Sequence, residues 1–370
     1  MITAETRVTE LLKQADVKIG GSRPQDIIVH NKLFFNRVIR YRELGLGESY
    51  MDGWWDCKRI DQLIEKLLTF NIPEHVKVSP ALLLAALPAL LKTQSISGAR
   101  KNAEHHYNIG NDLFERMLGE RMIYSCAYWK NAKNLDEAQE NKLDLICQKL
   151  QLKKGMTVLD IGCGWGGFAK YAANKYGVNV TGITPASEQV KMAKAATKGL
   201  PVKILQKDYR EISGNFDRIT SIGMLEHVGP KNYKNFFEIC KRMLSKDGLM
   251  LHHTIAFNSP SKHVDPWISK YIFPGGILPT LSQISSAVQN RLIIEDVQNI
   301  GPDYDKTLMA WYKNFTTHYS EIKENYDERF YRMWEFYLLI CAGAFRARQL
   351  QLFQVVMRHI KPDQTYIAAR

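Results

Sequence analysis

The sequence predicts an α/β protein with a Rossmann-like fold: a seven-stranded, mostly parallel sheet, preceded by a small, mostly helical N-terminal domain. Two observations lead to this prediction. In residues 157–167, TVLDIGCGWGG, a short apolar run ends in glycines, as a buried parallel strand does before a tight turn and a helix. After residue 157, strand-like and helix-like segments alternate, which is typical of a parallel sheet with helices on both faces.

The expected elements follow from apolar runs and from apolar positions at helical spacing. Strands are expected at residues 157–161, 178–183, 202–205, 216–222, 249–255, 292–297 and 364–369. Asn134 can cap a helix over 134–150, with Glu137 at the capping-box position. Two long, aromatic-rich helices are expected at 304–319 and 326–348.

Three stretches of the chain differ in composition. Residues 1–75 are expected to form the small domain, which associates with lipid, 76–101 an apolar helix and linker, and 102–370 the α/β domain with the active site. Within the first, residues 41–56 are either a turn-rich connection whose tryptophans fill the small core or an amphipathic surface for lipid.

Two apolar segments each allow two interpretations. Residues 81–91 are apolar almost all round, so a helix there is buried against protein or faces acyl chains. The aromatic, proline-marked segment 265–279 is either a lid over an apolar substrate or part of the core.

Charge and cysteine usage limit the classes of partner. The net charge of +12 favours an anionic partner, either nucleic acid or an anionic membrane surface. The six cysteines form no C-x-x-C pair and lie near no histidines at zinc spacing, so we expect reduced thiols and no metal site. The longest apolar run, 81–91, is too short to cross a bilayer, which takes about 20 residues. The N-terminus does not look like a signal peptide.

The glycine turn is expected to bind a cationic nucleoside. Gly162, Gly164 and Gly167 let the backbone bend and allow a ligand to lie against it. Asp160 stands just before the first glycine, where it suits a cation better than a phosphate, and the next strand ends at Thr184 instead of the ribose-binding acid of dinucleotide folds. S-adenosylmethionine fits both details better than NAD does; the alternative is a strand-turn-helix without a ligand.

Strand ends collect the residues that could do chemistry. Glu226 follows the strand 216–222, and His252 and His253 lie in the strand 249–255. In a doubly wound sheet these ends are neighbours beside the glycine turn, and alternation puts only one of the two histidines on the site side. Cys126 and Cys341 have no evident base partner in the sequence, and an inert buried thiol is the commoner state of cysteine.

Several motifs in this order resemble the bacterial cyclopropane-fatty-acyl-phospholipid synthases. They are HYNIGNDLF, YSCAYW, VLDIGCGWGG, GMLEHVG, PDYDKTLMAW and CAGAFRAR. GLGESYMDGWW is similar to the N-terminal domain of these enzymes, so the likeness covers nearly the whole chain, whereas mycolic acid cyclopropane synthases resemble only the second domain. The resemblance implies an S-adenosylmethionine-dependent methyltransferase fold.

The resemblance also implies a reaction. The family transfers a methylene group from S-adenosylmethionine to cis double bonds of unsaturated acyl chains in membrane phospholipids, through a carbocation that bound bicarbonate deprotonates. It implies that bicarbonate is held by Cys126, Glu226, His253, Ile255 and Tyr304. Cys341 is sometimes assigned as catalytic in the family, although we see no step for a covalent thiol. The cofactor contacts that it implies, together with the acid and the glycine expected from the turn itself, are Tyr124, Ser125, Asp160, Gly162, Gly164, Gly167, Thr184, Gln189 and Asp208.

The implied setting is a phospholipid bilayer. We expect a homodimer in the cytoplasm, attached peripherally to the inner face of the cell membrane, with no nucleic-acid partner because no RNA-binding motif is visible. Two alternatives stay open: a methyltransferase acting on another lipid, a small molecule or nucleic acid, and a lipid-binding protein without catalytic activity.

Overall fold

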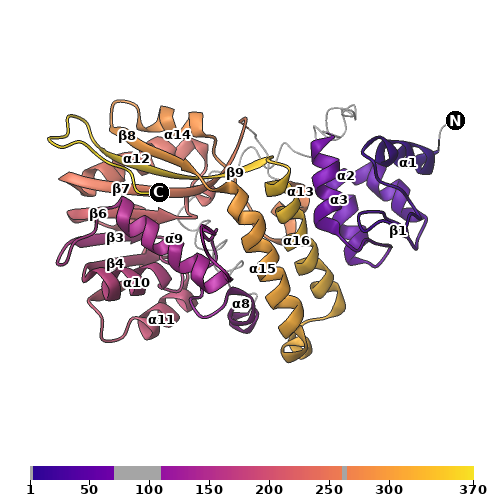
Figure 1. The fold of residues 1–370 in the computed structure, drawn as a ribbon, viewed down its shortest axis with the longest axis horizontal. Coiled ribbons are helices and arrows are strands. Elements are labelled where there is room, and N and C mark those ends of the chain that lie inside the picture. Colours follow the sequence, from indigo (N-terminus) through magenta and orange to yellow (C-terminus); the bar gives the residue numbers. More distant parts are fainter. Residues whose placement is uncertain (1–2, 71–109, 261–264) are drawn as a thin grey trace. The chain divides into compact units, whose positions relative to one another are not determined.

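The computed structural model describes residues 3–70, 110–260 and 265–370 (Figure 1). The described residues divide into two compact units. Unit 1 holds residues 3–70, 265–275 and 308–350, and unit 2 holds 110–260, 276–307 and 351–370. The apolar helix expected at 81–91 lies outside the described residues, as do the boundaries expected at 75 and 101, which stay predictions.

Unit 2 contains the predicted seven-stranded sheet (Figure 1). The strand order is β5-β4-β3-β6-β7-β9-β8, with every adjacent pair from β5 to β7 parallel and β8 antiparallel to β9. The strands are β3 (Thr157–Ile161), β4 (Asn179–Thr184), β5 (Val202–Gln206), β6 (Phe216–Ile222), β7 (Leu244–Phe257), β8 (Leu292–Asn299) and β9 (Leu350–His359). The Rossmann-like fold expected from the sequence is therefore confirmed.

The strand predicted at 364–369 is wrong. The last strand is β9, and residues 360–370 are irregular. Side chains hold this tail: the Tyr366 hydroxyl donates to the Lys149 carbonyl at 3.0 Å, and Arg370 pairs with Asp296. These side-chain contacts hold residues 360–370 in place without the backbone hydrogen bonds of a strand.

Helices cover both faces of the sheet, and two apolar cores result. On one face, α9 (Leu135–Lys149) and α10 (Gly167–Tyr176) bury their apolar side chains together with Leu249 and Leu251 of β7. On the other, α12 (Tyr233–Met243) and α14 (Leu281–Val288) do the same with Met250. Successive residues of β7 thus reach opposite cores, as strand alternation requires. The remaining helices of this part include α8 (Asn111–Leu118) and α11 (Ser187–Ala196).

The helix predicted at 134–150 is confirmed as α9, and its start has the expected cap. Asn134 accepts the backbone N–H of Glu137 at 2.9 Å. The helices predicted at 304–319 and 326–348 are α15 (Gly301–His318) and α16 (Glu328–Arg346). Residues of α15 up to 307 belong to unit 2, and those from 308 belong to unit 1.

Unit 1 is mostly helical and has an aromatic core. Besides α16 it contains α1 (Ala4–Gln14), β1 (Ile28–Val29), α2 (Leu33–Met51), β2 (Trp55–Asp56), α3 (Ile60–Thr69) and α13 (Pro266–Tyr271). Trp267 packs edge-on against Phe336 with ring centroids 4.9 Å apart, and both rings are buried. The domain boundaries expected from the sequence place residues 265–275 and 308–350 in the α/β domain. In the structure these residues fold with the N-terminal segment, because their aromatic side chains complete its core. For the segment 265–279, the expected alternatives were a lid over a substrate and part of the core. Trp267 is part of the core.

Residues 41–56 are mostly helical, so the turn-rich conformation of the first alternative is wrong, although its expectation that a tryptophan fills the small core is confirmed for Trp55. Helix α2 continues to Met51 past Arg42, whose positive φ of 49° breaks it in two. Gly45 and Gly47 allow close packing here: a Cβ on Gly47 would lie 2.4 Å from Trp267 Cδ1. Trp55 is fully buried in the core of unit 1.

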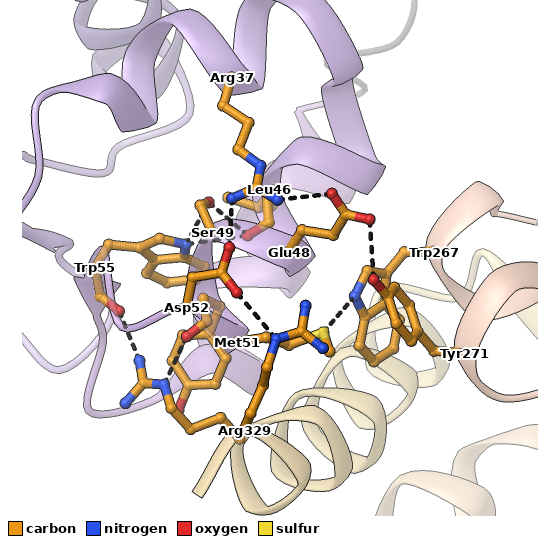
Figure 2. A network of polar contacts seen from close by, with 12 residues as sticks. Arg37, Leu46, Glu48, Ser49, Met51, Asp52, Trp55, Trp267, Tyr271 and Arg329 are labelled. Carbon is orange, nitrogen blue, oxygen red and sulfur yellow. Dashed lines mark hydrogen bonds and ion pairs between the residues drawn. The ribbon is translucent and has the colours of Figure 1, made fainter.

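The acidic side chains of this segment join the helices of unit 1 (Figure 2). Arg37 pairs with Glu48 at 2.8 Å and with Asp52 at 2.6 Å. Glu48 also accepts the Tyr271 hydroxyl at 3.0 Å, and Asp52 pairs with Arg329 at 3.0 Å. These carboxylates are therefore engaged within unit 1. None of the helices that the structure describes is long and apolar enough to cross a membrane.

Candidate active site

The predicted meeting of strand ends is present at the carboxyl edge of β6 and β7. Ile222, the last residue of β6, is in register with His253 of β7. Glu226 follows in the 3₁₀ helix η2 (Leu225–His227), and its Oε1 accepts the backbone N–H of Ile255 at 2.7 Å. Glu226, His253 and Ile255 are thus brought to one place, as expected from the sequence.

Glu226 has a buried carboxyl group whose pKa is close to neutral pH. The residue is only 7% exposed, and burial raises the pKa of its carboxyl to about 7, against the hydrogen bond from Ile255. Its second oxygen, Oε2, has no hydrogen-bond partner among the described residues. A buried acceptor without a partner is costly, so this oxygen is well suited to bind a ligand group.

The two adjacent histidines point into different surroundings. His252 lies edge-on to Phe236 and Phe237 of α12, and burial lowers its pKa to about 3. His253 faces the other way, with its Nδ1 3.4 Å from the Gln354 amide nitrogen. When that amide donates to Nδ1, the imidazole carries its proton on Nε2, which has no partner among the described residues.

The charge state of His253 follows from its burial. Burial lowers its pKa well below the usual value, and the nearby charge of Lys142 acts in the same direction. The imidazole is therefore neutral and offers one N–H donor. His252 is neutral too, but it sits in an aromatic core. The functional role expected for His253 stays a prediction.

Cys126 is buried as a protonated thiol. Its Sγ donates to the Ala127 carbonyl at 3.2 Å, and burial raises the thiol pKa well above the usual value. The next residues are fastened to α15, because Thr307 Oγ1 accepts from the Ala127 backbone at 3.1 Å and from Trp129 Nε1 at 2.9 Å. Tyr304, also buried, lies in the same part of α15. A thiolate nucleophile is not available at Cys126.

The end of β3 carries the acid expected at the glycine turn. Asp160 is buried, and its Oδ2 has no partner among the described residues. Burial raises the pKa of its carboxyl to about 7, and Lys142 opposes this. Gly162 and Gly164 have positive φ angles of 82° and 53°, and a Cβ on Gly164 would meet no atom of the described residues within 4 Å. The part of the chain that the structure describes therefore leaves open space beside this turn.

Gly167 has a different role from the other two glycines of the turn. A Cβ there would lie 2.8 Å from Ile123 Cγ1. Its missing side chain therefore lets the segment before Tyr124 pack on the start of α10. Its contact with a cofactor stays a prediction.

The expected cofactor residues at β4 and β5 are buried and already hydrogen-bonded. Thr184 donates its hydroxyl to Gln189 Oε1 at 2.7 Å, which leaves the Gln189 NH2 group available as a donor. Asp208 accepts from Arg210 Nε at 2.7 Å and from Arg210 Nη2 at 2.8 Å, and it caps the short helix η1 (Tyr209–Glu211). A ligand at Asp208 would share the carboxylate with this arginine.

Tyr124 and Ser125 are held between α8 and α9. The Tyr124 ring packs against Phe114 with centroids 5.3 Å apart. The Ser125 carbonyl accepts from Gln139 at 3.0 Å, and its hydroxyl accepts from Lys142 Nζ at 3.0 Å. The sequence analysis did not single out Gln139 and Lys142 of α9. The available signal was that these two polar residues stand among the apolar positions of an amphipathic helix.

Cys341 differs from the other candidates in its location. It lies in α16 and belongs to unit 1, whereas the other candidates belong to unit 2. Burial raises the pKa of its thiol to about 12, so it is protonated at neutral pH. No described residue near Cys341 lowers the pKa of its thiol: burial and the charge of Asp265 both raise it.

The strand order, with a glycine turn and a buried acid at the end of β3, defines the class: the protein is an S-adenosylmethionine-dependent methyltransferase. The family described as mycolic acid cyclopropane synthetase matches residues 94–355. The chain belongs to this family of cyclopropane synthases.

Relatives and solved structures agree with this assignment. The chain is 52% identical to the cyclopropane-fatty-acyl-phospholipid synthase of Escherichia coli strain K12 over 351 residues, 94% of this chain and 91% of that protein. The structure of the cyclopropane synthase MmaA2 from Mycobacterium tuberculosis is 30% identical, covers 70% of this chain and 97% of its own, and has a TM-score of 0.66. Mycolic acid cyclopropane synthase CmaA1, complexed with SAH and CTAB, is 32% identical with the same coverage and TM-score.

Proposed function

We propose that the protein transfers a methylene group from S-adenosylmethionine to cis double bonds of unsaturated acyl chains in membrane phospholipids, forming cyclopropane fatty acids. The 52% identity to the Escherichia coli phospholipid synthase over nearly the whole chain supports this substrate class. The structural observation that carries the proposal is that Glu226 and His253 lie at the same edge of the sheet, with Oε2 of one and Nε2 of the other both buried without partners among the described residues.

Such a site suits deprotonation of a cation in a dry pocket. A methyl cation equivalent adds to the alkene, the resulting carbocation loses a proton from the new methyl group, and the ring closes. An alkene is a weak nucleophile, so the reactants have to be aligned and water excluded. Burial of Glu226, His253 and Tyr304 supports an environment of this kind.

We propose that bicarbonate binds between these groups. The orphaned donor on His253 and the orphaned acceptor on Glu226 fit an ion that has both an oxyanion and a hydroxyl. Cys126, Ile255 and Tyr304 complete the proposed pocket. When bound, bicarbonate would supply a base for the methyl proton. Glu226 would accept the hydroxyl proton of that ion in a hydrogen bond, and neutral His253 would donate to its oxyanion.

We propose a peripheral location on the inner face of the membrane and a homodimer as the working form. The net charge of +12 supports attraction to anionic lipid. Unit 1 also exposes the large apolar side chains of Leu33, Ile39 and Tyr41, with Lys32 and Arg40 exposed beside them in sequence. Apolar side chains flanked by cations are typical of surfaces that bind the lipid interface.

Lipid analysis tests the proposed reaction. The protein is expressed in a host without cyclopropane lipids, and the phospholipid acyl chains are analysed by mass spectrometry and proton NMR. We expect acyl chains heavier by one CH2 that show the signals of cyclopropane protons. The alternative, methylation of another lipid or of a small molecule, would leave the acyl double bonds unchanged.

A further inference from the structure

Helix α9 contains two buried lysines that are satisfied in different ways. Lys149 forms an ion pair with Asp296 at 3.1 Å. Lys142 donates to the Ser125 hydroxyl at 3.0 Å instead, and no carboxylate of the described residues forms an ion pair with it. Burying an ammonium group is costly unless it is paired with an opposite charge and hydrogen-bonded. Lys142 therefore calls for an explanation that Lys149 does not.

The hydrogen bond from Lys142 determines what Ser125 can do. Burial lowers the pKa of Lys142 to about 7, so the side chain is an ammonium group at pH values below that. In this form it only donates, so the Ser125 oxygen is its acceptor, and the hydroxyl proton of Ser125 is directed elsewhere. The Ser125 backbone is fixed as well, because its carbonyl accepts from Gln139 at 3.0 Å. The described residues thus present Ser125 as an oriented hydroxyl donor.

Ring contacts connect the Lys142–Ser125 pair to the glycine turn: Tyr124, next to Ser125, packs against Phe114, and Phe114 packs against Trp165 of the turn with centroids 5.0 Å apart. The charge of Lys142 acts on Asp160 at the end of β3 and on Cys126, and it also acts on His253. An ammonium group behind a serine hydroxyl favours a negatively charged group in front of it. The amino-acid carboxylate is the anionic group of S-adenosylmethionine, whose adenine and ribose are neutral and whose ammonium and sulfonium groups are positive.

We propose that Lys142 is a positioning residue for the cofactor, holding the Ser125 hydroxyl as a donor to the carboxylate of its amino-acid part. This inference rests on the proposed function, in which S-adenosylmethionine binds at the glycine turn. The ammonium group also contributes a positive potential that favours the same carboxylate. Lys142 acts through Ser125 and takes no part in the transfer itself.

Two ligands that differ in the amino-acid part separate this role from a structural one. S-adenosylhomocysteine has the carboxylate, and 5′-methylthioadenosine lacks the whole amino-acid part. Calorimetric titration of Lys142→Met should show about 10–100-fold weaker binding of S-adenosylhomocysteine, as expected for losing a charge-supported hydrogen bond. Binding of 5′-methylthioadenosine should change by no more than about 2-fold.

Lys149→Met is the matched control, since it removes another buried lysine from the same helix. It should leave the ratio of the two dissociation constants unchanged, whatever it does to thermal stability. Ser125→Ala should reproduce the selective loss, and adding Lys142→Met to it should cost little more, because both changes remove the same contact. Lys142→Gln, which retains an N–H donor, should restore part of the selectivity.

The possible outcomes distinguish a failure of the positioning role of Lys142 from a failure of the proposed function. Equal weakening of both ligands in Lys142→Met, or no weakening of S-adenosylhomocysteine, would overturn the positioning role while leaving the methyltransferase intact. If Lys142→Met does not fold, Ser125→Ala and Lys142→Gln decide by the same ratio. Wild-type protein that binds neither ligand would overturn the proposed function and this inference together.

Discussion

Replacing Glu226 by glutamine keeps the shape of the side chain and changes one atom's hydrogen-bonding role. Oε1 accepts from Ile255 at 2.7 Å, a bond that the amide oxygen can keep. The NH2 group then takes the place of Oε2, the acceptor that has no partner among the described residues. A donor there cannot receive the hydroxyl proton of bicarbonate, so kcat should fall about 10²-fold. The affinity for S-adenosylmethionine should stay the same.

The pH dependence of turnover provides the sharper assay. Burial raises the pKa of Glu226 to about 7, so the carboxylate is lost as the pH falls through that value. We expect kcat of the wild type, measured on unsaturated phospholipid vesicles, to decrease with falling pH around 7, and kcat of Glu226→Gln to lack this step. A wild-type kcat that is constant through pH 7, or a variant with wild-type turnover, would refute the assigned role.

The same burial affects stability with the opposite sign. The folded pKa of about 7 exceeds the ordinary value of 4.5, so the folded protein binds the proton more tightly than the unfolded chain. Wild-type stability therefore falls as the pH rises between these values, by up to about 3 kcal/mol, because one pKa unit corresponds to about 1.4 kcal/mol. Denaturant unfolding should show Glu226→Gln gaining on the wild type above pH 7 but not below about pH 4.5. A constant difference between them would contradict the burial argument.

Three further predictions concern unit 1, the membrane and the base. Gly47→Ala should destabilise the protein by about 2–3 kcal/mol, because the added Cβ would lie 2.4 Å from Trp267; an unchanged melting temperature would mean that the ring can move. Co-sedimentation with anionic vesicles should weaken as salt rises, since salt screens exposed charges, and equal binding at low and high salt would exclude an electrostatic contribution. Turnover should fall in carbonate-depleted buffer and return on adding bicarbonate; undiminished turnover by protein free of bound bicarbonate would instead make a side chain the base, with His253 the first candidate.

The elements around the glycine turn could be predicted closely because each begins and ends with a clear signal. The strands β3 and β6 match their predicted residues: β3 is a short apolar run that ends before Gly162, and Gly214 and Gly223 lie on either side of β6. β9 was missed because its run LQLFQVVMRH follows a long helix without a glycine or proline between them. Helix α2 was mistaken for turns because glycines that permit close packing look the same in sequence as glycines that permit bending.

The positions of the candidate residues were predictable where residues end strands and unpredictable where burial decides the surroundings. Topology brings Glu226 and one of His252 and His253 to the same edge of the sheet, because alternation turns only one of the two histidines that way. Lys142 does not, because a lysine in an amphipathic helix is ordinarily exposed, and its burial depends on Ser125 lying against α9. The same limitation applies to Thr307, whose hydroxyl holds the Ala127 and Trp129 nitrogens from a position some 180 residues further along the chain.

Unit 1 is assembled from three separate lengths of chain, and this has a consequence for dissection of the molecule. Gly343 of α16 lies so close to α3 that a Cβ would be 2.5 Å from the Asp61 carbonyl, and Arg346 pairs with Asp61 at 2.7 Å. A fragment that starts after residue 70 would retain Trp267, Phe336 and Gly343 without the N-terminal residues that they pack against. Such a truncation would expose apolar surface on α13 and α16 and leave Arg346 without the Asp61 carboxylate. A clean excision of the N-terminal region therefore calls for redesigning α13 and α16 as well.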